Sequence, residues 1–189
     1  MDATETAVLA RARQGDSEAF RALVERHGRS VFRLAYRMTG NEQDAEDVVQ
    51  ESFLRAYRQL GRFESRANFG TWLYRIVSNC SVDLMRSKQA RHDQVHGDSL
   101  DESMELPAAE LPGPERMAQS AEIERRVQTA LRELSPLERA AFTLRHYEGR
   151  SIDEISAALN LGTSAAKHSV FRAVKKLRVA LAPLRSQES

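Results

Sequence analysis

The chain has 189 residues, of which 41% are hydrophobic, enough for one domain or two small helical ones. Its 28 Lys and Arg residues nearly balance 27 Asp and Glu residues, so net charge alone indicates no partner. A single cysteine, Cys80, excludes an internal disulfide and a cysteine-rich zinc site, and no apolar run reaches the roughly 20 residues that span a bilayer. We therefore expect a cytoplasmic protein without membrane insertion, metal or cofactor.

Charge is distributed unevenly along the chain. Residues 93–115 carry seven acids and no Lys or Arg, whereas 157–187 carry six Lys or Arg and no acid. The sequence predicts an all-α fold with two small helical domains, at 1–90 and 116–189, joined by a flexible acidic linker at 91–115. The linker is either a solvated spacer or a segment whose acids occupy a basic channel of a partner.

The first helices are predicted from their end signals. Residues 4–13 form a short helix, Gly15 breaks it, and Asp16 or Ser17 can cap the next one. That helix continues to Gly40, and Asn41 can cap an acidic helix after it. His27 is expected to be packed or solvated, since no second metal ligand lies at helical spacing from it.

The acidic helix after Asn41 is amphipathic, with apolar residues at Ala45, Val49, Phe53, Ala56, Tyr57 and Leu60. Its polar face has acids and no base over residues 41–51, which suits a basic protein surface. We expect this face to bind a protein through Asp47, Gln50, Glu51 and Arg55. Asp44 could belong to that set, or its charge could simply stabilise the helix N-terminus.

A short polar loop at residues 61–68 leads into a second amphipathic helix with basic residues on its polar side. Its aromatic residues are either core or platforms on which unstacked bases bind, while the arginines beside them suit phosphates. The candidate single-strand site comprises Phe63, Ser65, Arg66, Asn68, Phe69, Trp72, Arg75, Asn79 and Arg86.

The second domain is expected to begin with a helix at about 116–132. Two helix-start signals follow, Ser135 with Glu138 and Ser151 with Glu154. A short helix, a turn at 160–162 and a longer basic helix then follow the helix-turn-helix pattern, although an ordinary helical hairpin has the same spacing. The residues expected to face outward, toward base edges or phosphates, are Ser164, Ala165, Lys167, His168, Arg172, Lys175 and Lys176.

Two motifs together resemble the extracytoplasmic-function sigma factors of bacterial RNA polymerase, within the sigma-70 family. DAEDVVQESFLRAYRQLGRF followed by TWLYRIVSN is similar to the second conserved region, and LSPLERAAFTLRHYEGRSIDEISAALNLGTSAAKHSVFRAVKKLR to the fourth. The resemblance implies a non-catalytic, stress-type transcription initiation factor. This agrees with the absence of a phosphate-binding loop, paired metal ligands or an activated nucleophile from the sequence.

The resemblance also implies roles for the candidate residues. Asp44, Asp47, Gln50, Glu51 and Arg55 would dock on the beta-prime clamp helices of core RNA polymerase. Residues 63–69 and Trp72 would capture a flipped minus-10 base, and Arg75, Asn79 and Arg86 would hold the DNA backbone. The helix from Ser164 to Lys176 would bind the minus-35 major groove, other parts of its domain would bind the beta flap, and an anti-sigma factor would control the protein.

Two departures from the family pattern affect these expectations. Leu73 stands where housekeeping relatives have a second Trp, which implies weaker melting and a narrower promoter set. The residues entering the last helix, 162–167, differ from those of many relatives, which leaves the promoter sequence open.

The competing hypothesis is a free-standing helix-turn-helix regulator whose first domain dimerises or senses a ligand. This hypothesis assigns no function to the face at 47–51.

Overall fold

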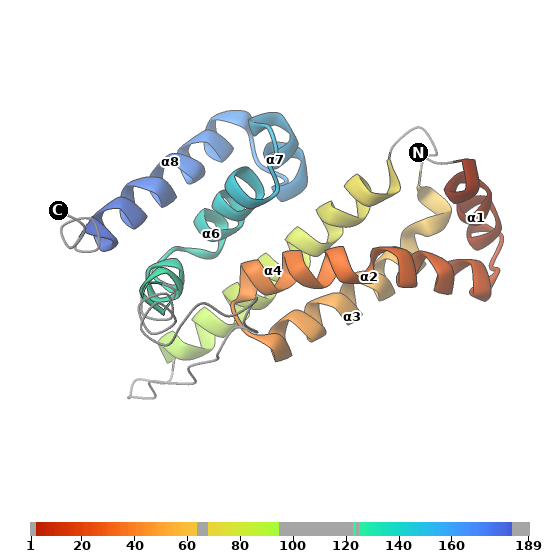
Figure 1. Cartoon of the computed structure of the whole chain (residues 1–189), viewed down its shortest axis with the longest axis horizontal. Coiled ribbons are helices and arrows are strands. Elements are labelled where there is room, and N and C mark those ends of the chain that lie inside the picture. The colour runs from red at the N-terminus through yellow and green to blue at the C-terminus, as the bar shows by residue number, and fades with distance from the viewer. Residues whose placement is uncertain (1–2, 64–67, 95–122, 124, 183–189) are drawn as a thin grey trace, which may run out of the picture.

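The computed structural model describes residues 3–63, 68–94, 123 and 125–182, and these contain helices and no strand (Figure 1). Its elements are α1 (Ala3–Arg13), α2 (Ser17–Thr39), α3 (Glu42–Gln59), the 3-10 turn η1 (Leu60–Arg62), α4 (Phe69–Gln94), α6 (Pro136–Phe142), the π-helical turn η2 (Thr143–Tyr147), α7 (Ile152–Leu159) and α8 (Thr163–Ala180). Residues 125–132 are helical as well. No helix within these ranges is long and apolar enough to cross a membrane.

The predicted end signals of the first domain are confirmed. The Asp16 carboxylate accepts a hydrogen bond from the Ala19 backbone N–H at 3.0 Å and caps α2. Gly40 ends α2 with φ +82°, a left-handed conformation that glycine adopts without a steric cost. Asn41 then caps α3 by accepting from the Asp44 N–H at 2.8 Å. These local signals set where α2 and α3 begin and end.

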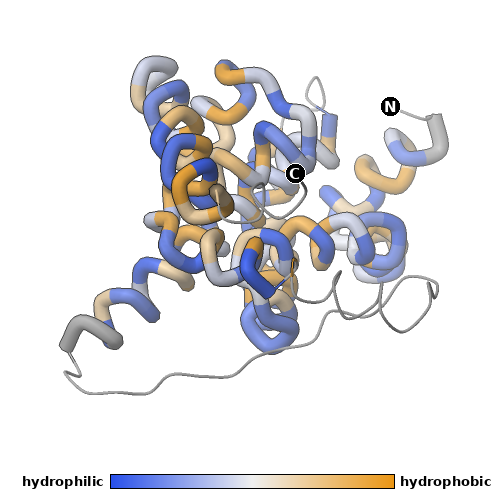
Figure 2. Tube along the Cα trace, turned by 60° about the vertical axis from the view of Figure 1, so that its left-hand side comes forward, coloured by the Kyte–Doolittle hydropathy of each residue, from blue (hydrophilic) through white to orange (hydrophobic). Residues whose placement is uncertain are grey.

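The core of the first domain lies between α2, α3 and α4. Hydrophobic and hydrophilic residues alternate along the helices in the coloured trace of Figure 2. The residues with no exposed surface include Val31, Leu34, Ala35, Met38, Ala45, Ala56, Phe69, Leu73 and Val77. Cys80 is buried among them, and burial raises the pKa of its thiol. The cysteine is therefore a small core residue that stays protonated at neutral pH.

The second domain begins its helices as expected. Ser135 and Glu138 form a capping box at α6, and Ser151 and Glu154 form another at α7. Asn160 adopts φ +51° and ends α7, and α8 starts three residues later. The described part of the second domain therefore contains the predicted short helix, turn and long basic helix.

The two domains also pack against each other, which the sequence did not predict. Ala140, Ala141, Leu144, Ile155 and Leu159 belong to the same buried cluster as the first domain's core. Helix α4 contacts both α6 and α7, and Figure 1 shows these helices stacked on it. An apolar helix face predicts that another element of the fold covers it, but the hydrophobic periodicity does not identify that element.

The expected domain and linker boundaries agree with the structure only in part. Helix α4 continues to Gln94, past the expected end of the first domain at 90. The rest of the expected linker, 95–115, lies outside the described residues, as does the start of the helix expected from residue 116. The helical residues 125–132 lie within that expected helix, and Ala130, Leu131 and Leu134 pack with α8 residues in a separate small cluster.

Candidate functional site

The acidic face of α3 is only partly free. Asp47 and Gln50 are exposed, whereas Glu51 accepts a hydrogen bond from Arg55 Nε at 2.6 Å. Arg55 also reaches Asp83 of α4 at 3.2 Å. The hydrogen bond to Glu51 is the main cause that raises the pKa of Arg55. Arg55 therefore joins α3 to α4. Of the predicted polymerase-binding residues, Asp47 and Gln50 are the exposed ones for which no such side-chain contact is described.

Asp44 lies inside the fold rather than on this face. It is 6% exposed, and one carboxylate oxygen accepts from Asn41 Nδ2 at 2.7 Å. The other oxygen is 2.6 Å from Lys88 Nζ on α4. These contacts hold the start of α3 against α4. For Asp44 the structure thus supplies a stabilising role, the alternative that the sequence left open beside polymerase binding.

An apolar groove of about 440 Å³ lies between α2 and α3, beside the acidic face. Its lining consists of Phe20, Val24, Phe32, Glu46, Val49, Gln50, Phe53, Leu54 and Tyr57. Leu54 and Tyr57 are 44% and 49% exposed, although the periodicity of the sequence had placed Tyr57 in the core. Exposed apolar side chains beside charged ones are typical of a protein-binding surface.

The aromatic residues before and within α4 have different roles. Phe63 and Phe69 are buried, with ring centroids 5.8 Å apart, so they are core residues. Trp72 is half-buried and lies 5.0 Å from the Phe63 ring. Asn68 caps α4 by accepting from the Thr71 N–H at 3.2 Å. Ser65 and Arg66 lie outside the described residues. Of the three aromatic residues in the predicted site, Trp72 alone is not buried.

A second, polar cleft of about 360 Å³ brings together residues of α3 and α4. It is lined by Arg55, Gln59, Trp72, Arg75, Ile76 and Asn79. An indole, two guanidinium groups and two amides can contact a base and a phosphate at once. The cleft unites three predicted DNA contacts and adds Gln59, which the sequence did not single out. Arg86 is exposed but does not line it.

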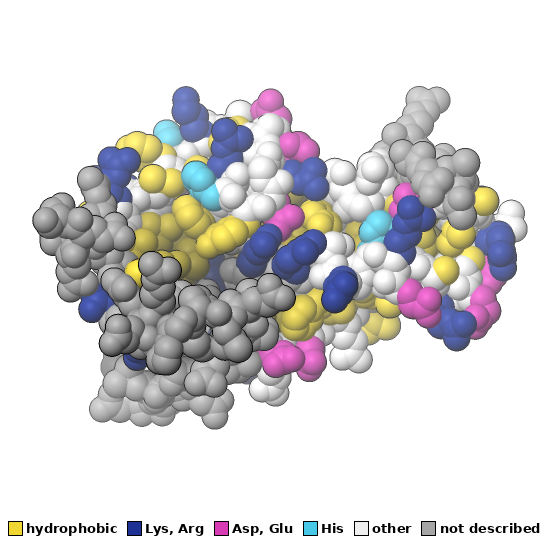
Figure 3. Space-filling model, viewed as in Figure 1, with side chains coloured by type: hydrophobic (Ala, Val, Ile, Leu, Met, Phe, Trp, Pro, Cys, Tyr) yellow, Lys and Arg dark blue, Asp and Glu magenta, His cyan; other side chains and the backbone are white. Residues whose placement is uncertain are grey.

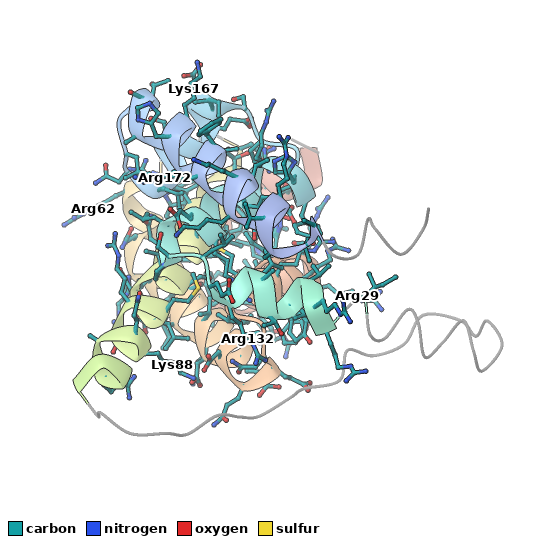
Figure 4. The ribbon with its side chains drawn as sticks, turned by 90° about the vertical axis from the view of Figure 1, so that its left-hand side faces the viewer. Arg29, Arg62, Lys88, Arg132, Lys167 and Arg172 are labelled. Carbon is teal, nitrogen blue, oxygen red and sulfur yellow. The ribbon has the colours of Figure 1, made fainter. Side chains whose placement is uncertain are left out.

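Helix α8 presents its polar start to solvent. Ser164, Ala165, Lys167, His168 and Lys175 are exposed, and Lys167 projects from the N-terminal part of the helix (Figure 4). No acid occurs between Thr163 and Ala180. Lys and Arg side chains are spread over the α7–α8 end of the molecule (Figure 3). This end therefore suits the negative potential of nucleic acid.

Two of the predicted DNA contacts on α8 are paired within the domain. Lys176 Nζ lies 2.7 Å and Arg172 Nε 3.3 Å from the carboxylate of Glu138, whose side chain is 5% exposed. Burial raises the pKa of Glu138, but hydrogen bonds from Lys176 and Ser135, with the Lys176 charge, hold it below its ordinary value overall. Glu138 is therefore ionised and fixes α8 against α6.

Phe171 is a residue that the sequence reasoning missed. It is 65% exposed on α8, three residues from His168 and four from Lys167 and Lys175, so all four share one face. Its helical spacing from Lys167, His168 and Lys175 was the sequence signal that could have identified Phe171 as a candidate. An exposed phenyl ring among cations can contact the methyl group of thymine in a major groove.

No group of three or more His, Cys, Asp or Glu side chains in the described ranges is arranged to hold a metal ion. His27 instead lies 2.8 Å from Glu5 of α1 and contacts the Phe69 ring edge-on. It is a packed residue, as expected. The candidate functional surfaces are the α3 face with its groove, the α4 cleft and the outer side of α8.

Comparisons with known proteins identify the two regions of the chain. Residues 23–91 match the sigma-70 region 2 family, and residues 124–177 match sigma-70 region 4. The chain is 36% identical over 160 residues to the ECF RNA polymerase sigma factor SigE of Mycolicibacterium smegmatis, covering 85% of this chain and 60% of that relative's length. It is 31% identical to the ECF RNA polymerase sigma factor SigW of Bacillus subtilis over 91% of this chain and 94% of SigW.

Among solved structures, CnrH in complex with the cytosolic domain of CnrY is similar, with a TM-score of 0.63 and 28% sequence identity. The match covers 95% of this chain and 97% of CnrH. Both conserved regions, in the expected order, and near full-length similarity to SigW show that the chain belongs to the extracytoplasmic-function sigma factors of the sigma-70 family.

Proposed function

We propose that the chain is an alternative sigma factor that binds core RNA polymerase, directs it to promoters with minus-35 and minus-10 elements, and promotes DNA melting. One observation carries this proposal. The described residues form an apolar groove on α3, a polar cleft with two arginines between α3 and α4, and a separate helix, α8, that carries Lys and Arg and no acid; these features support one protein-binding surface and two nucleic-acid surfaces. A free-standing helix-turn-helix regulator needs only the last of these.

The α3 face and its groove are the proposed docking site for the beta-prime clamp helices. An apolar side chain of the clamp would enter the groove beside Leu54 and Tyr57, which burial of their exposed surface favours. Asp47 and Gln50 at the rim would receive basic or polar groups. Glu51 would contribute while it also holds Arg55.

The polar cleft is the proposed minus-10 surface. Trp72 offers the only half-exposed ring of the predicted aromatic set within the described residues, and Arg75 and Asn79 lie beside it. Stacking a base on an aromatic side chain contributes roughly 1–3 kcal/mol, comparable with the few kcal/mol that flipping a base costs. Phe63 and Phe69 would act by supporting Trp72 from beneath.

The outer side of α8 is the proposed minus-35 surface. Ser164, Lys167 and His168, in the first turns, would reach base edges, with Phe171 against a thymine methyl group. Lys175, which is exposed, would contact phosphate. The charges of Arg172 and Lys176 are partly neutralised by Glu138, so we assign them a smaller share of the binding. The beta flap would bind elsewhere on this domain.

Regulation by an anti-sigma factor is part of the proposal. CnrH, a structural relative, is solved with the cytosolic domain of CnrY bound to it. The exposed groove and acidic face offer this chain a surface that a protein inhibitor could cover. We place the protein in the cytoplasm, where polymerase works, and assign it no catalytic activity of its own.

The test is the binding of labelled full-length protein to purified core polymerase. A double change of Asp47→Ala and Gln50→Ala should weaken binding about tenfold, the effect of roughly 1.4 kcal/mol. The matched control is Glu25→Ala, an exposed acid on α2 paired with Arg21, which should bind normally. Circular dichroism checks folding. Unchanged affinity of the double variant would refute the docking site.

A further inference from the structure

The first turn of α4, which leads into Trp72, packs on a histidine of α2. The His27 and Phe69 rings meet edge-on, with their centroids 5.2 Å apart. A Cβ atom added to Gly70 would lie 3.8 Å from His27 Cε1, so the imidazole also lies directly against the backbone of that turn. Because close-packed groups cannot move independently, the position of His27 determines where α4 begins.

Glu5 of α1 holds the His27 ring in place. His27 Nε2 lies 2.8 Å from Glu5 Oε1, and the two side chains are 16% and 10% exposed. A hydrogen bond between two mostly buried groups is costly to break, because neither group regains full contact with water. The pair therefore fixes the orientation of the imidazole and connects α1, through His27, to α4.

Phe69 extends this contact to the polar cleft. The Phe69 side chain has no exposed surface, and its ring centroid lies 5.6 Å from that of Trp72. The Trp72 backbone N–H donates to the Asn68 carbonyl at 3.0 Å, within the same turn. Trp72 in turn lines the polar cleft. A shift of Phe69 would therefore move the indole that forms part of this cleft.

Helix α1 lies at the end of the first domain where α3 ends and α4 begins, and it contacts η1 (Figure 1). Leu9 and Ala12 of α1 belong to the buried core. The match to sigma-70 region 2 begins at residue 23, so it includes His27 but not Glu5. None of the three candidate surfaces gives α1 a role.

We propose that Glu5 and His27 are positioning residues for the minus-10 surface. Glu5 holds His27, His27 holds the first turn of α4, and Phe69 passes this constraint to the Trp72 ring. The proposal rests on the proposed function and adds α1 to the elements that build the minus-10 surface. Neither Glu5 nor His27 lines the polar cleft, so both act on DNA binding through Trp72.

The first test uses Trp72, the only tryptophan in the chain, as a fluorescent reporter in the DNA-free protein. Glu5→Ala removes the acceptor that holds His27, whereas Glu5→Gln keeps an oxygen in that place. Glu5→Ala should raise the acrylamide quenching constant of Trp72 while circular dichroism shows a folded chain. Glu5→Gln should resemble wild type, as should the control Glu25→Ala, an exposed acid of α2 paired with Arg21.

The second test measures DNA binding by the full-length variants, using fluorescence anisotropy. Glu5→Ala should bind a labelled mixed-sequence single strand of about 20 nucleotides about fivefold more weakly than wild type. Its affinity for a mixed-sequence duplex, which α8 would bind, should be unchanged. His27→Ala should weaken single-strand binding at least as much, and adding Glu5→Ala to it should cause no further loss, because Glu5 acts through His27.

Three results would overturn the positioning role: unchanged quenching of Trp72 in Glu5→Ala, unchanged affinity of Glu5→Ala for the single strand, or equal losses for single strand and duplex. Additive losses from Glu5→Ala and His27→Ala would contradict the order of action. If wild type binds no single strand, the minus-10 surface of the proposed function is refuted instead. The quenching of Trp72 in the DNA-free protein still decides the positioning role in that case, so the two failures are distinguishable.

Discussion

Arg139→Met should stabilise the protein, because it removes a buried charge without a described acidic partner. Burial and the charge of Arg132 lower the pKa of Arg139 to about 10, well below its ordinary value. The Arg139 guanidinium packs on Gly40, at the end of α2. At about 1.4 kcal/mol for each pKa unit, the destabilisation is about 3 kcal/mol. A cation with a lowered folded-state pKa destabilises the fold at every pH below that value, so the cost is fully present at neutral pH.

The expected gain at pH 7 is about 1–3 kcal/mol, since methionine keeps much of the packing but loses the attraction to the end of α2. For a chain of this length, that range corresponds to a rise in melting temperature of roughly 2–12 °C. Urea unfolding of the full chain measures it. Arg58→Met, an exposed position on α3, is the matched control and should stay within about 0.5 kcal/mol. A loss of stability in Arg139→Met would refute the reasoning.

Three further substitutions test other parts of the account. Glu138→Gln should lower the free energy of unfolding by about 1–3 kcal/mol at pH 7. Because the pKa of Glu138 is lowered in the fold, wild type should lose this advantage as the pH falls through the carboxylate range, which urea unfolding at pH 7 and pH 4 measures. Phe171→Ala should leave stability within about 0.5 kcal/mol. Its affinity for minus-35 duplex should fall about tenfold by fluorescence anisotropy, unlike Val179→Ala at the other end of α8. Trp72→Ala, after a folding check, should form closed complexes but give a weaker permanganate footprint of melted DNA; an undiminished footprint would contradict its role.

Helix ends and helix faces were predictable because their signals are local. Gly40 with Asn41, and Ser135 with Glu138, act through atoms a few residues apart, and the structure confirms each. The sequence likewise predicted that the helix after residue 68 is amphipathic, and Leu73 and Val77 of α4 are buried in the structure. The family motifs extended this to the order of the two domains.

Long-range contacts were not predictable from the sequence. Asp44 is buried because Lys88, 44 residues later, reaches it. The sequence predicted that Arg172 and Lys176 face outward to bind DNA, but in the structure both are paired with Glu138. The contact between the two domains includes the ion pair of Arg37 and Glu148, and no sequence pattern distinguished these two residues from other charged surface residues. Each case requires knowing which helix lies opposite.

The most direct test of the central claim is multi-round transcription with purified core polymerase and fragmented genomic DNA, with and without the protein, followed by mapping of RNA 5′ ends. An initiation factor predicts new start sites that share two spaced elements upstream. It also predicts that the Asp47→Ala and Gln50→Ala double variant loses these starts while Glu25→Ala keeps them. Folded protein and active core that yield no new start sites would contradict the account.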